Sequence, residues 1–256
     1  MAEDIAGRGD PIRTLQLMWG RVDAPRRGPK SRVSMAELVQ AAIAIADAEG
    51  IDAVSTRRVA EAVGISPMSF YTHIPDKSVL LDLMLDGVSG GDYPAPVFDP
   101  AHWRSNITMI ASEFRRNYIA HPWMLQVSTH RPVLGPNMMK SYETFLSALD
   151  GLGLDEIEMD MSVTMVGNYV FGAARDVARS RMVKEQTGMS DDEWWYAIAP
   201  FLETLDFSPY PVASRIGPVV GELYGLGDPD RAFDFGLERV LDGLEVMIAS
   251  KGKPPA

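Results

Sequence analysis

Apolar residues recur at helical spacing along nearly the whole chain, and no segment shows the strict alternation of a half-buried strand. The first clear helix is predicted to begin at Ser34, whose side chain can form a capping box with Glu37, and to end at Glu49 before Gly50. Beyond a proline-rich break at 92–100, further helices are predicted over residues 100–120, 137–149, 155–181, 191–204 and 229–249. The pattern therefore predicts an all-α protein, with the break as a linker or long loop.

Two short apolar-periodic runs, residues 57–63 and 67–74, are joined by three residues only. Gly64 permits a positive-φ turn, Ser66 can cap the second run, and Pro67 has a φ already suited to a first helical turn. A short helix, a tight turn and a second short helix, held by a preceding longer helix, form a helix-turn-helix unit with three helices. The second short helix of such a unit fits the major groove of DNA.

The second short helix carries a polar face that packing does not use. Phe70 and Ile74 share one face with the apolar positions of the preceding run, so we expect both in the core. Five neighbours are left pointing outward: Met68, Ser69, Tyr71, Thr72 and His73. Thr56 (as the cap) and Arg57 begin the first short helix and Lys77 begins the following one, where unpaired N–H groups and the helix dipole favour phosphate. Any one of these residues could be a solvated surface residue, but the set at this spacing predicts DNA binding.

The segment 57–80 reads Arg-Arg-Val-Ala, then Gly-Ile-Ser-Pro-Met-Ser-Phe-Tyr-Thr-His-Ile-Pro-Asp-Lys-Ser-Val-Leu, and it closely resembles the DNA-binding domain of the TetR family of one-component repressors. A weaker resemblance to the tetracycline-repressor-like ligand domain lies in residues 121–123, 131–137 and 233–244. The resemblance implies an all-α homodimer with two N-terminal reading heads. It also implies a C-terminal domain that binds a small effector and changes the spacing of the heads.

The family's DNA-contacting positions can be carried over residue by residue. The resemblance implies phosphate contacts at Thr56, Arg57, Tyr71, His73 and Lys77, and base contacts at Pro67, Met68, Ser69 and Thr72. It divides the chain into a flexible basic arm (1–32), a helix-turn-helix domain (33–79) and a ligand-binding and dimerisation domain (80–250).

Charge is unevenly distributed along the chain. The net charge is −11, but residues 1–80 hold 10 basic and 10 acidic side chains, so the acidity belongs to the rest. Within the arm, Arg26, Arg27 and Lys30 lie just ahead of the first long helix and are candidates for phosphate or minor-groove contacts. A solvated tail is the alternative interpretation of this basic segment.

Composition excludes several classes of protein. The chain has 256 residues, 46% of them hydrophobic, and no apolar run reaches the roughly 18 residues of a membrane span. The N-terminus lacks the apolar region of a signal peptide, so we expect a cytoplasmic protein with no membrane partner. There is no cysteine, the four histidines never fall at i, i+4 spacing, and no phosphate-binding glycine motif occurs. We therefore expect no catalytic residue, no metal site and no cofactor.

The candidate effector site rests on aromatic, methionine and polar residues in the predicted C-terminal helices. The candidates are Trp103, Met138, Tyr142, Met165, Asn168, Tyr169 and Arg175. Asn168 and Arg175 are polar in an otherwise apolar helix and could orient a ligand, or could equally lie at a dimer seam formed by 161–181 and 230–249. Family members that bind tetracycline with magnesium use histidines in the ligand domain, and one of these stands where this chain has Val127, although His130 is near. A metal-bound tetracycline is therefore not expected.

Together these features favour a transcriptional regulator. We interpret the chain as a repressor that occupies a palindromic operator until a small hydrophobic effector binds. The alternative is a helical ligand-binding or interaction protein that does not bind an operator, which the acidic C-terminal part would suit and the basic arm would not.

Overall fold

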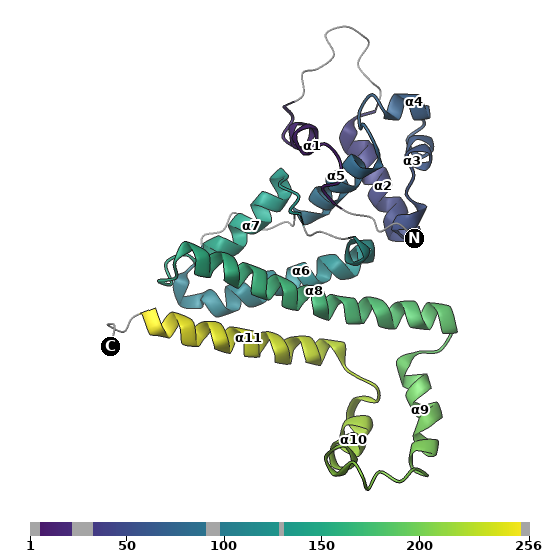
Figure 1. Ribbon diagram of the computed structural model, residues 1–256, viewed down its shortest axis with the longest axis vertical. Helices are drawn as coiled ribbons and strands as arrows, with labels where there is room; N and C mark the ends of the chain where they lie inside the picture. The colour runs from purple at the N-terminus through teal and green to yellow at the C-terminus, as the bar shows by residue number, and fades with distance from the viewer. Residues whose placement is uncertain (1–5, 22–32, 91–97, 128–130, 252–256) are drawn as a thin grey trace.

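The computed structural model describes residues 6–21, 33–90, 98–127 and 131–251, and every regular element within these ranges is helical (Figure 1). The head is built from α2 (Met35–Glu49), α3 (Thr56–Ala62), α4 (Pro67–Phe70) and α5 (Lys77–Ser89), with the short η1 (Ile51–Ala53). The body contains α6 (Trp103–Ala120), α7 (Pro136–Leu149), α8 (Glu156–Thr187) and α11 (Pro229–Lys251), with the short η2 (Pro100–His102) and η3 (Pro122–Gln126). The predicted all-α class is confirmed for the described residues.

Local capping explains where most of these helices begin. Ser34 and Glu37 form the predicted capping box at the start of α2. The start of α3 differs from the prediction, because the side chain of Ser55, not Thr56, caps the helix by accepting from the Arg58 N–H. The helix α4 is also shorter than the predicted 67–74 run: it ends at Phe70, and the next three residues form a turn.

Residues 11–18 form a helix, α1 (Pro11–Met18), where the sequence suggested part of a flexible arm over 1–32. Asp10 caps it by accepting from two backbone N–H groups, and Pro11 occupies the first turn. Thr14 and Leu17 are buried, and α1 lies against α5. The pair Asp10-Pro11 is a signal for the start of a helix, and the interpretation of residues 1–32 as a flexible arm, which is based on charge, does not use it. Arg26, Arg27 and Lys30 lie outside the described residues.

A buried carboxylate joins the head to the body. Asp86 of α5 accepts hydrogen bonds from the backbone N–H groups of Asn137 (3.1 Å) and Met138 (2.9 Å). It thereby caps α7, whose own N-cap residue, Gly135, has no side chain to do so. Burial raises the pKa of Asp86, and the hydrogen bonds from Met138 and Asn137 oppose that shift. The helix that leaves the reading head is therefore fixed to the first turn of α7.

The body packs around a core shared by α6, α7, α8 and α11, with Phe145, Val166 and Leu241 fully buried. Arg104 ties α6 to α11, since it pairs with Glu238 (2.5 Å) and Asp242 (2.6 Å). The head has a second core, and Trp123 of η3 is part of it. Thus η3 follows α6 of the body along the chain, but its side chain Trp123 packs in the core of the head.

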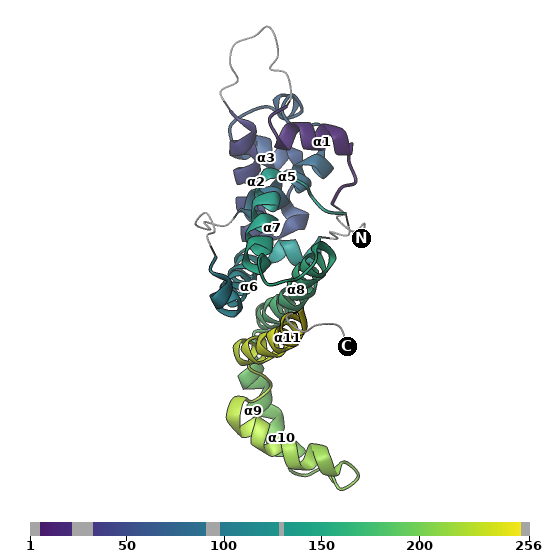
Figure 2. The same ribbon diagram turned by 90° about the vertical axis from the view of Figure 1, so that its left-hand side faces the viewer.

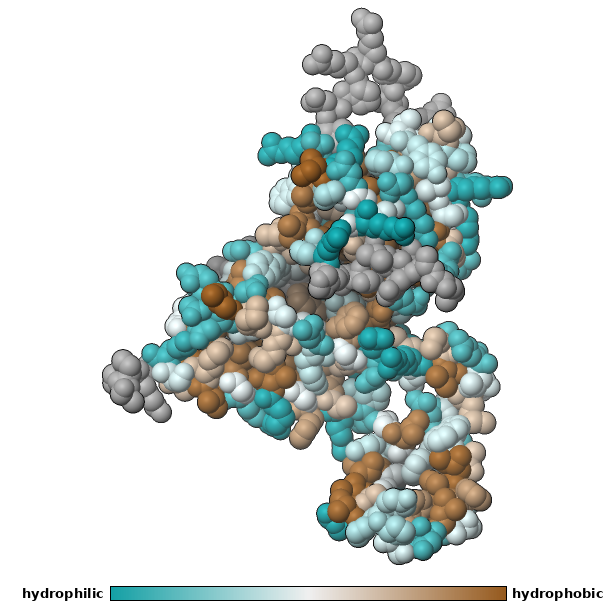
Figure 3. Space-filling model, in the orientation of Figure 1, coloured by the Kyte–Doolittle hydropathy of each residue, from teal (hydrophilic) through white to brown (hydrophobic). Residues whose placement is uncertain are grey.

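Two further helices, α9 (Asp191–Leu202) and α10 (Pro211–Tyr224), project away from the body (Figure 2). We name this pair the α9–α10 arm, to distinguish it from the basic arm of residues 1–32. The sequence predicted α9 but not α10, whose interior contains Pro218. The space-filling view shows hydrophobic residues gathered on this arm (Figure 3). Phe201 of α9 and Val219 of α10 are both 66% exposed. In the described part of the chain, no helix combines the length and apolar character needed to cross a membrane.

Candidate functional site

The helix-turn-helix unit is anchored by buried apolar residues. Gly64 takes φ +73° in the turn between α3 and α4, in the region that glycine favours. Ser66 caps α4 by accepting from the Ser69 N–H at 3.2 Å. Phe70 and Ile74 are fully buried, as predicted, and they fix α4 and the following turn against α3 and α5. The outer face of α4 is consequently held on a rigid base.

The exposed surface of this unit has the character of a contact surface. Met68 is 77% exposed and Tyr71 is also exposed, although both are large and apolar in part. The hydroxyl groups of Tyr71 and Thr56 lie 3.2 Å apart, which joins the turn after α4 to the start of α3. Thr72 donates its hydroxyl hydrogen to the Ser69 carbonyl (2.7 Å), so its oxygen stays available as an acceptor. Apolar and hydroxyl groups of this kind can contact thymine methyl groups and base edges.

Two arginines at the start of α3 differ in how firmly they are held. Arg58 makes a two-pronged ion pair with Glu49 of α2 (2.5 and 2.9 Å), and these hydrogen bonds lower the pKa of Glu49. Arg57 pairs with Glu61 at 2.8 Å, and both side chains are exposed to solvent. Exposed pairs of this type contribute little, so a DNA phosphate could replace Glu61 as the partner of Arg57. Arg58 instead braces α3 on α2.

The structure brings most of the predicted DNA-contacting residues to α3, α4 and the turn that follows. Exposed members are Arg57, Pro67, Met68, Tyr71 and Thr72; half-buried members are Thr56, Ser69, His73 and Lys77. Sequence reasoning missed Ser55, although a serine directly before a helical run is a recognisable cap signal.

We expect Thr72 to contact a DNA base and Lys77 to contact a DNA phosphate. Thr72→Ala should relax sequence preference at one position per half-site and cost roughly 1–3 kcal/mol at that contact, because a base contact is lost. Lys77→Ala should weaken binding to all sequences alike and flatten the salt dependence, because a phosphate contact is lost. Titration of matched specific and random duplexes at several salt concentrations measures both effects. An equal loss for Thr72→Ala on specific and random DNA would contradict its assignment.

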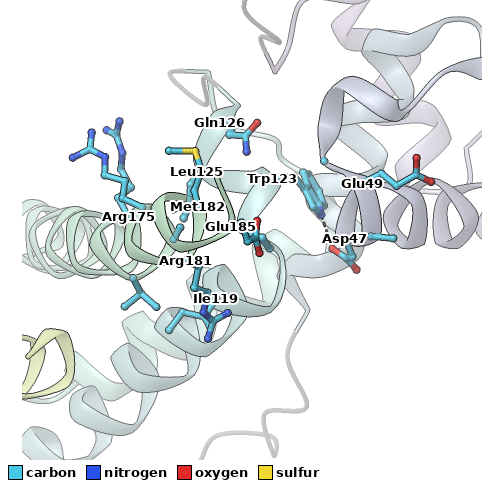
Figure 4. A pocket seen from close by; sticks show the side chains of 17 residues that line it. Asp47, Glu49, Ile119, Trp123, Leu125, Gln126, Arg175, Arg181, Met182 and Glu185 are labelled. Carbon is cyan, nitrogen blue, oxygen red and sulfur yellow. Dashed lines mark hydrogen bonds between the residues drawn. The ribbon is translucent and has the colours of Figure 1, made fainter. Parts of the chain in front are cut away.

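Two cavities lie beside α8. The larger, which we name the junction cavity, has a volume of about 640 Å³ and lies between the end of α2, η3 and the second half of α8 (Figure 4). The smaller, the α8–α11 cavity, has a volume of about 400 Å³ and is lined by Asn168, Tyr169, Asp176 and Phe233, among others. Both are within or close to the size range of small-molecule sites.

The predicted effector residues do not converge on one cavity. Asn168 and Tyr169 line the α8–α11 cavity, and Arg175 lines the junction cavity. The remaining four candidates line neither: Trp103, Met138, Tyr142 and Met165. Two of the seven make contacts that fix them structurally, since Tyr142 donates to Asp160 (2.7 Å) and Tyr169 donates to the Phe233 carbonyl (2.8 Å).

Comparison with protein families identifies both parts of the chain. The model described as "Tetracyclin repressor-like, C-terminal domain" matches residues 95–248. The model described as "Bacterial regulatory proteins, tetR family" matches residues 38–84, which contain the helix-turn-helix unit.

Individual proteins show the same likeness. The chain is 40% identical over 251 residues to the HTH-type transcriptional repressor DrrR1 of Streptomyces coeruleorubidus, an alignment that covers 97% of this chain and 90% of that protein. Among solved structures, ActR of Streptomyces coelicolor in complex with actinorhodin aligns with a TM-score of 0.70 and 28% identity, over 84% of this chain and 96% of that one. The same protein without ligand aligns with a TM-score of 0.69 and 26% identity, over 88% and 99% of the two chains.

Proposed function

Because the chain belongs to the TetR family of bacterial regulatory proteins, we propose that it is a transcriptional repressor that leaves a palindromic operator when a small hydrophobic effector binds. The observation that carries this proposal is the exposed Met68, Tyr71 and Thr72 surface, held rigid by the buried Phe70. Such a surface is suited to major-groove contacts. The site is a binding surface and not a reaction centre, and DNA binding would place the protein in the bacterial cytoplasm.

A homodimer supplies the two heads that a palindrome requires. On α8 and α11, several large apolar side chains are exposed in the single chain: Ile157, Met161, Phe235 and Val246. An apolar surface of this extent along two long helices favours burial against a second copy. Large apolar side chains are also exposed on α9 and α10, among them Phe201 and Val219.

Effector release follows from linkage between the two binding events. If the effector and the operator prefer different separations of the heads, each must weaken the binding of the other by the same factor. The contact between Asp86 and the first turn of α7 supports this mechanism, because it ties the helix that carries the head to the body. A change in the body around α7 would therefore reach α5.

The proposed effector is a ring-containing hydrophobic compound bound without metal. The solved relative named above was crystallised with actinorhodin and, separately, with (S)-DNPA. Val127, which stands where the metal-dependent members have a histidine, is buried and apolar here, and this supports metal-free binding.

We expect Asn168→Ala to weaken effector binding while leaving operator affinity without effector nearly unchanged. Asn168 is exposed and lines the α8–α11 cavity beside Tyr169, so its amide is available to a ligand. Loss of one neutral hydrogen bond to a ligand corresponds to roughly 0.5–1.5 kcal/mol. Thermal-shift titration with a library of hydrophobic ring compounds finds the effector and then compares the variant. If Asn168→Ala breaks the dimer instead, the residue lies at the seam and not in a ligand site.

Electrophoretic mobility shift with the DNA upstream of the gene, at stated salt concentrations, tests the function as a whole. Binding that prefers this DNA to random DNA, and that a ring compound reverses, is the expected result. A folded dimer with no preference for any sequence would favour the alternative of a helical ligand-binding protein without an operator.

A further inference from the structure

We propose that the junction cavity is a binding site for a ring-containing organic anion, and that its occupation is transmitted to the reading head through Asp47. This site is separate from the α8–α11 cavity. Only the transmission to DNA rests on the proposed function; the ligand site itself does not.

The walls of the junction cavity suit a flat ring. Ile119 contributes an apolar side chain from the end of α6, and Trp123 of η3 borders the cavity although it is only 1% exposed. Val177 and Met182 line the opposite wall on α8, and methionine adapts readily to ring-shaped ligands. A volume of about 640 Å³ lies within the range of small-molecule sites. The cavity can therefore hold a bicyclic or tricyclic ring between η3 and α8.

The charges around the cavity favour an anion. Arg175, Arg179 and Arg181 line it from α8, and in the part of the chain that the structure describes neither Arg179 nor Arg181 forms an ion pair. The lining carboxylates are Asp47, Glu49 and Glu185. Two of these three already accept strong hydrogen bonds, from Trp123 and His121 and from Arg58 respectively. Arg179 and Arg181 are therefore two lining cations without an ion-pair partner, and Glu185 is the one lining carboxylate that accepts no such hydrogen bond in the described residues. The unpaired charge at this site is positive on balance.

Arginine side chains suit the ligand class in two ways. The guanidinium group pairs with carboxylate or sulfonate through parallel hydrogen bonds, and it also stacks on aromatic rings. Arg175 already lies over the ring of Phe171, with its Cζ 5.7 Å from the ring centre. The ligand would place its ring towards Trp123 and its acid group towards Arg179 and Arg181.

Asp47 is the contact through which occupation can reach the head. It lies near the C-terminal end of α2, and its Oδ1 accepts from Trp123 Nε1 and from His121 Nδ1, both at 2.8 Å. Figure 4 shows the Trp123–Asp47 hydrogen bond at one side of the cavity and the α8 residues at the other. A ligand that contacts η3 beside Trp123 would therefore act on the hydrogen bonds that join η3 to α2. Because α2 holds α3 through the Glu49–Arg58 pair, a shift of α2 changes the position of the reading surface.

Calorimetric titration of the full-length protein tests the site without DNA. The probes are naphthalene-2-sulfonate and its neutral analogue 2-naphthalenemethanol, which share the ring and differ in charge. We expect the sulfonate to bind about tenfold tighter, as one charge-assisted contact corresponds to roughly that factor. The Arg179→Gln/Arg181→Gln variant should lose about this tenfold preference and still bind the alcohol within about twofold.

Lys184→Gln is the matched control, because it removes an exposed positive charge from the same stretch of α8 outside the cavity lining. A preference that survives the arginine substitutions, or that Lys184→Gln removes equally, overturns the proposed site. Circular dichroism melting confirms that each variant is folded, and the single Arg179→Gln variant gives the same comparison at half the charge change.

Trp123→Phe tests the transmission, since it keeps a ring in the wall and removes the donor to Asp47. Saturating naphthalene-2-sulfonate should change the operator affinity of the unaltered protein by at least about fivefold, and that of Trp123→Phe by much less, with probe binding retained. Trp194→Phe, in α9, is the control. Unchanged operator affinity in the unaltered protein overturns the transmission. Absence of DNA binding would instead contradict the proposed function, and the calorimetry would still decide the site.

Discussion

Replacing Gly135 with alanine is expected to lower the free energy of unfolding by about 3 kcal/mol, the upper part of the range for overpacking a buried site. An added Cβ at Gly135 would lie 2.2 Å from both Cγ and Oδ1 of Asp86, far inside van der Waals contact. The carboxylate has no room to withdraw, because it is buried and holds the N–H groups of Asn137 and Met138. Urea unfolding followed by circular dichroism measures the change.

Gly227→Ala is the matched control for this substitution. Gly227 lies in an exposed segment after α10 where an added Cβ meets nothing within 4 Å, so we expect a change of less than about 0.5 kcal/mol. Asp86→Ala in the Gly135→Ala background should recover part of the loss, because the clash and the carboxylate are removed together. A Gly135→Ala protein as stable as the parent would show that α5 and α7 are not held together by this contact.

The sequence predicted the elements whose signals are local. The capping box at Ser34 lies within four residues of its partner, Glu37, and is present in the structure. Phe70 and Ile74 were placed in the core by helical spacing alone, and they are buried. The outward face of α4 followed from the same spacing, and three of the five residues predicted to point outward, Met68, Tyr71 and Thr72, are exposed.

Contacts between distant segments could not be predicted in this way. Asp86 caps a helix that begins about 50 residues later, and nothing near it in the sequence marks it as a cap. Asp47 and Trp123 are 76 residues apart, and Asp47 is indistinguishable by pattern from any polar position on an amphipathic helix. For the same reason, the seven effector candidates were chosen by residue type, and their division between two cavities and elsewhere depends on the packing of α8 against its neighbours. In contrast, α1 did carry a local signal, Asp10-Pro11, within a segment interpreted from its charge.

The largest functional loss is expected from Phe235→Asp combined with Val246→Asp on α11. These side chains are 65% and 73% exposed in the single chain, and we place both at the dimer seam. A carboxylate buried in an interface costs several kcal/mol, and two-fold symmetry repeats each substitution in the partner. The dimer should therefore dissociate at micromolar concentration, as measured by sedimentation equilibrium. Operator affinity should fall by at least about a hundredfold, because the two heads no longer bind as a linked pair.

Ala101→Asp is the control, since it adds one negative charge, against two in the α11 variant, at an exposed position of η2 and removes no large apolar group. It should leave both the dimer and operator binding unchanged, which separates loss of the seam from a general effect of charge near DNA. Residual binding of the α11 variant to a single half-site should match the affinity of one head. Phe70 and Ile74, which support the reading surface, lie in the core of the head, whereas α11 packs in the core of the body. A variant that stays dimeric would move the seam away from α11. In that case the exposed apolar residues of α9 and α10 would be the next surface to substitute.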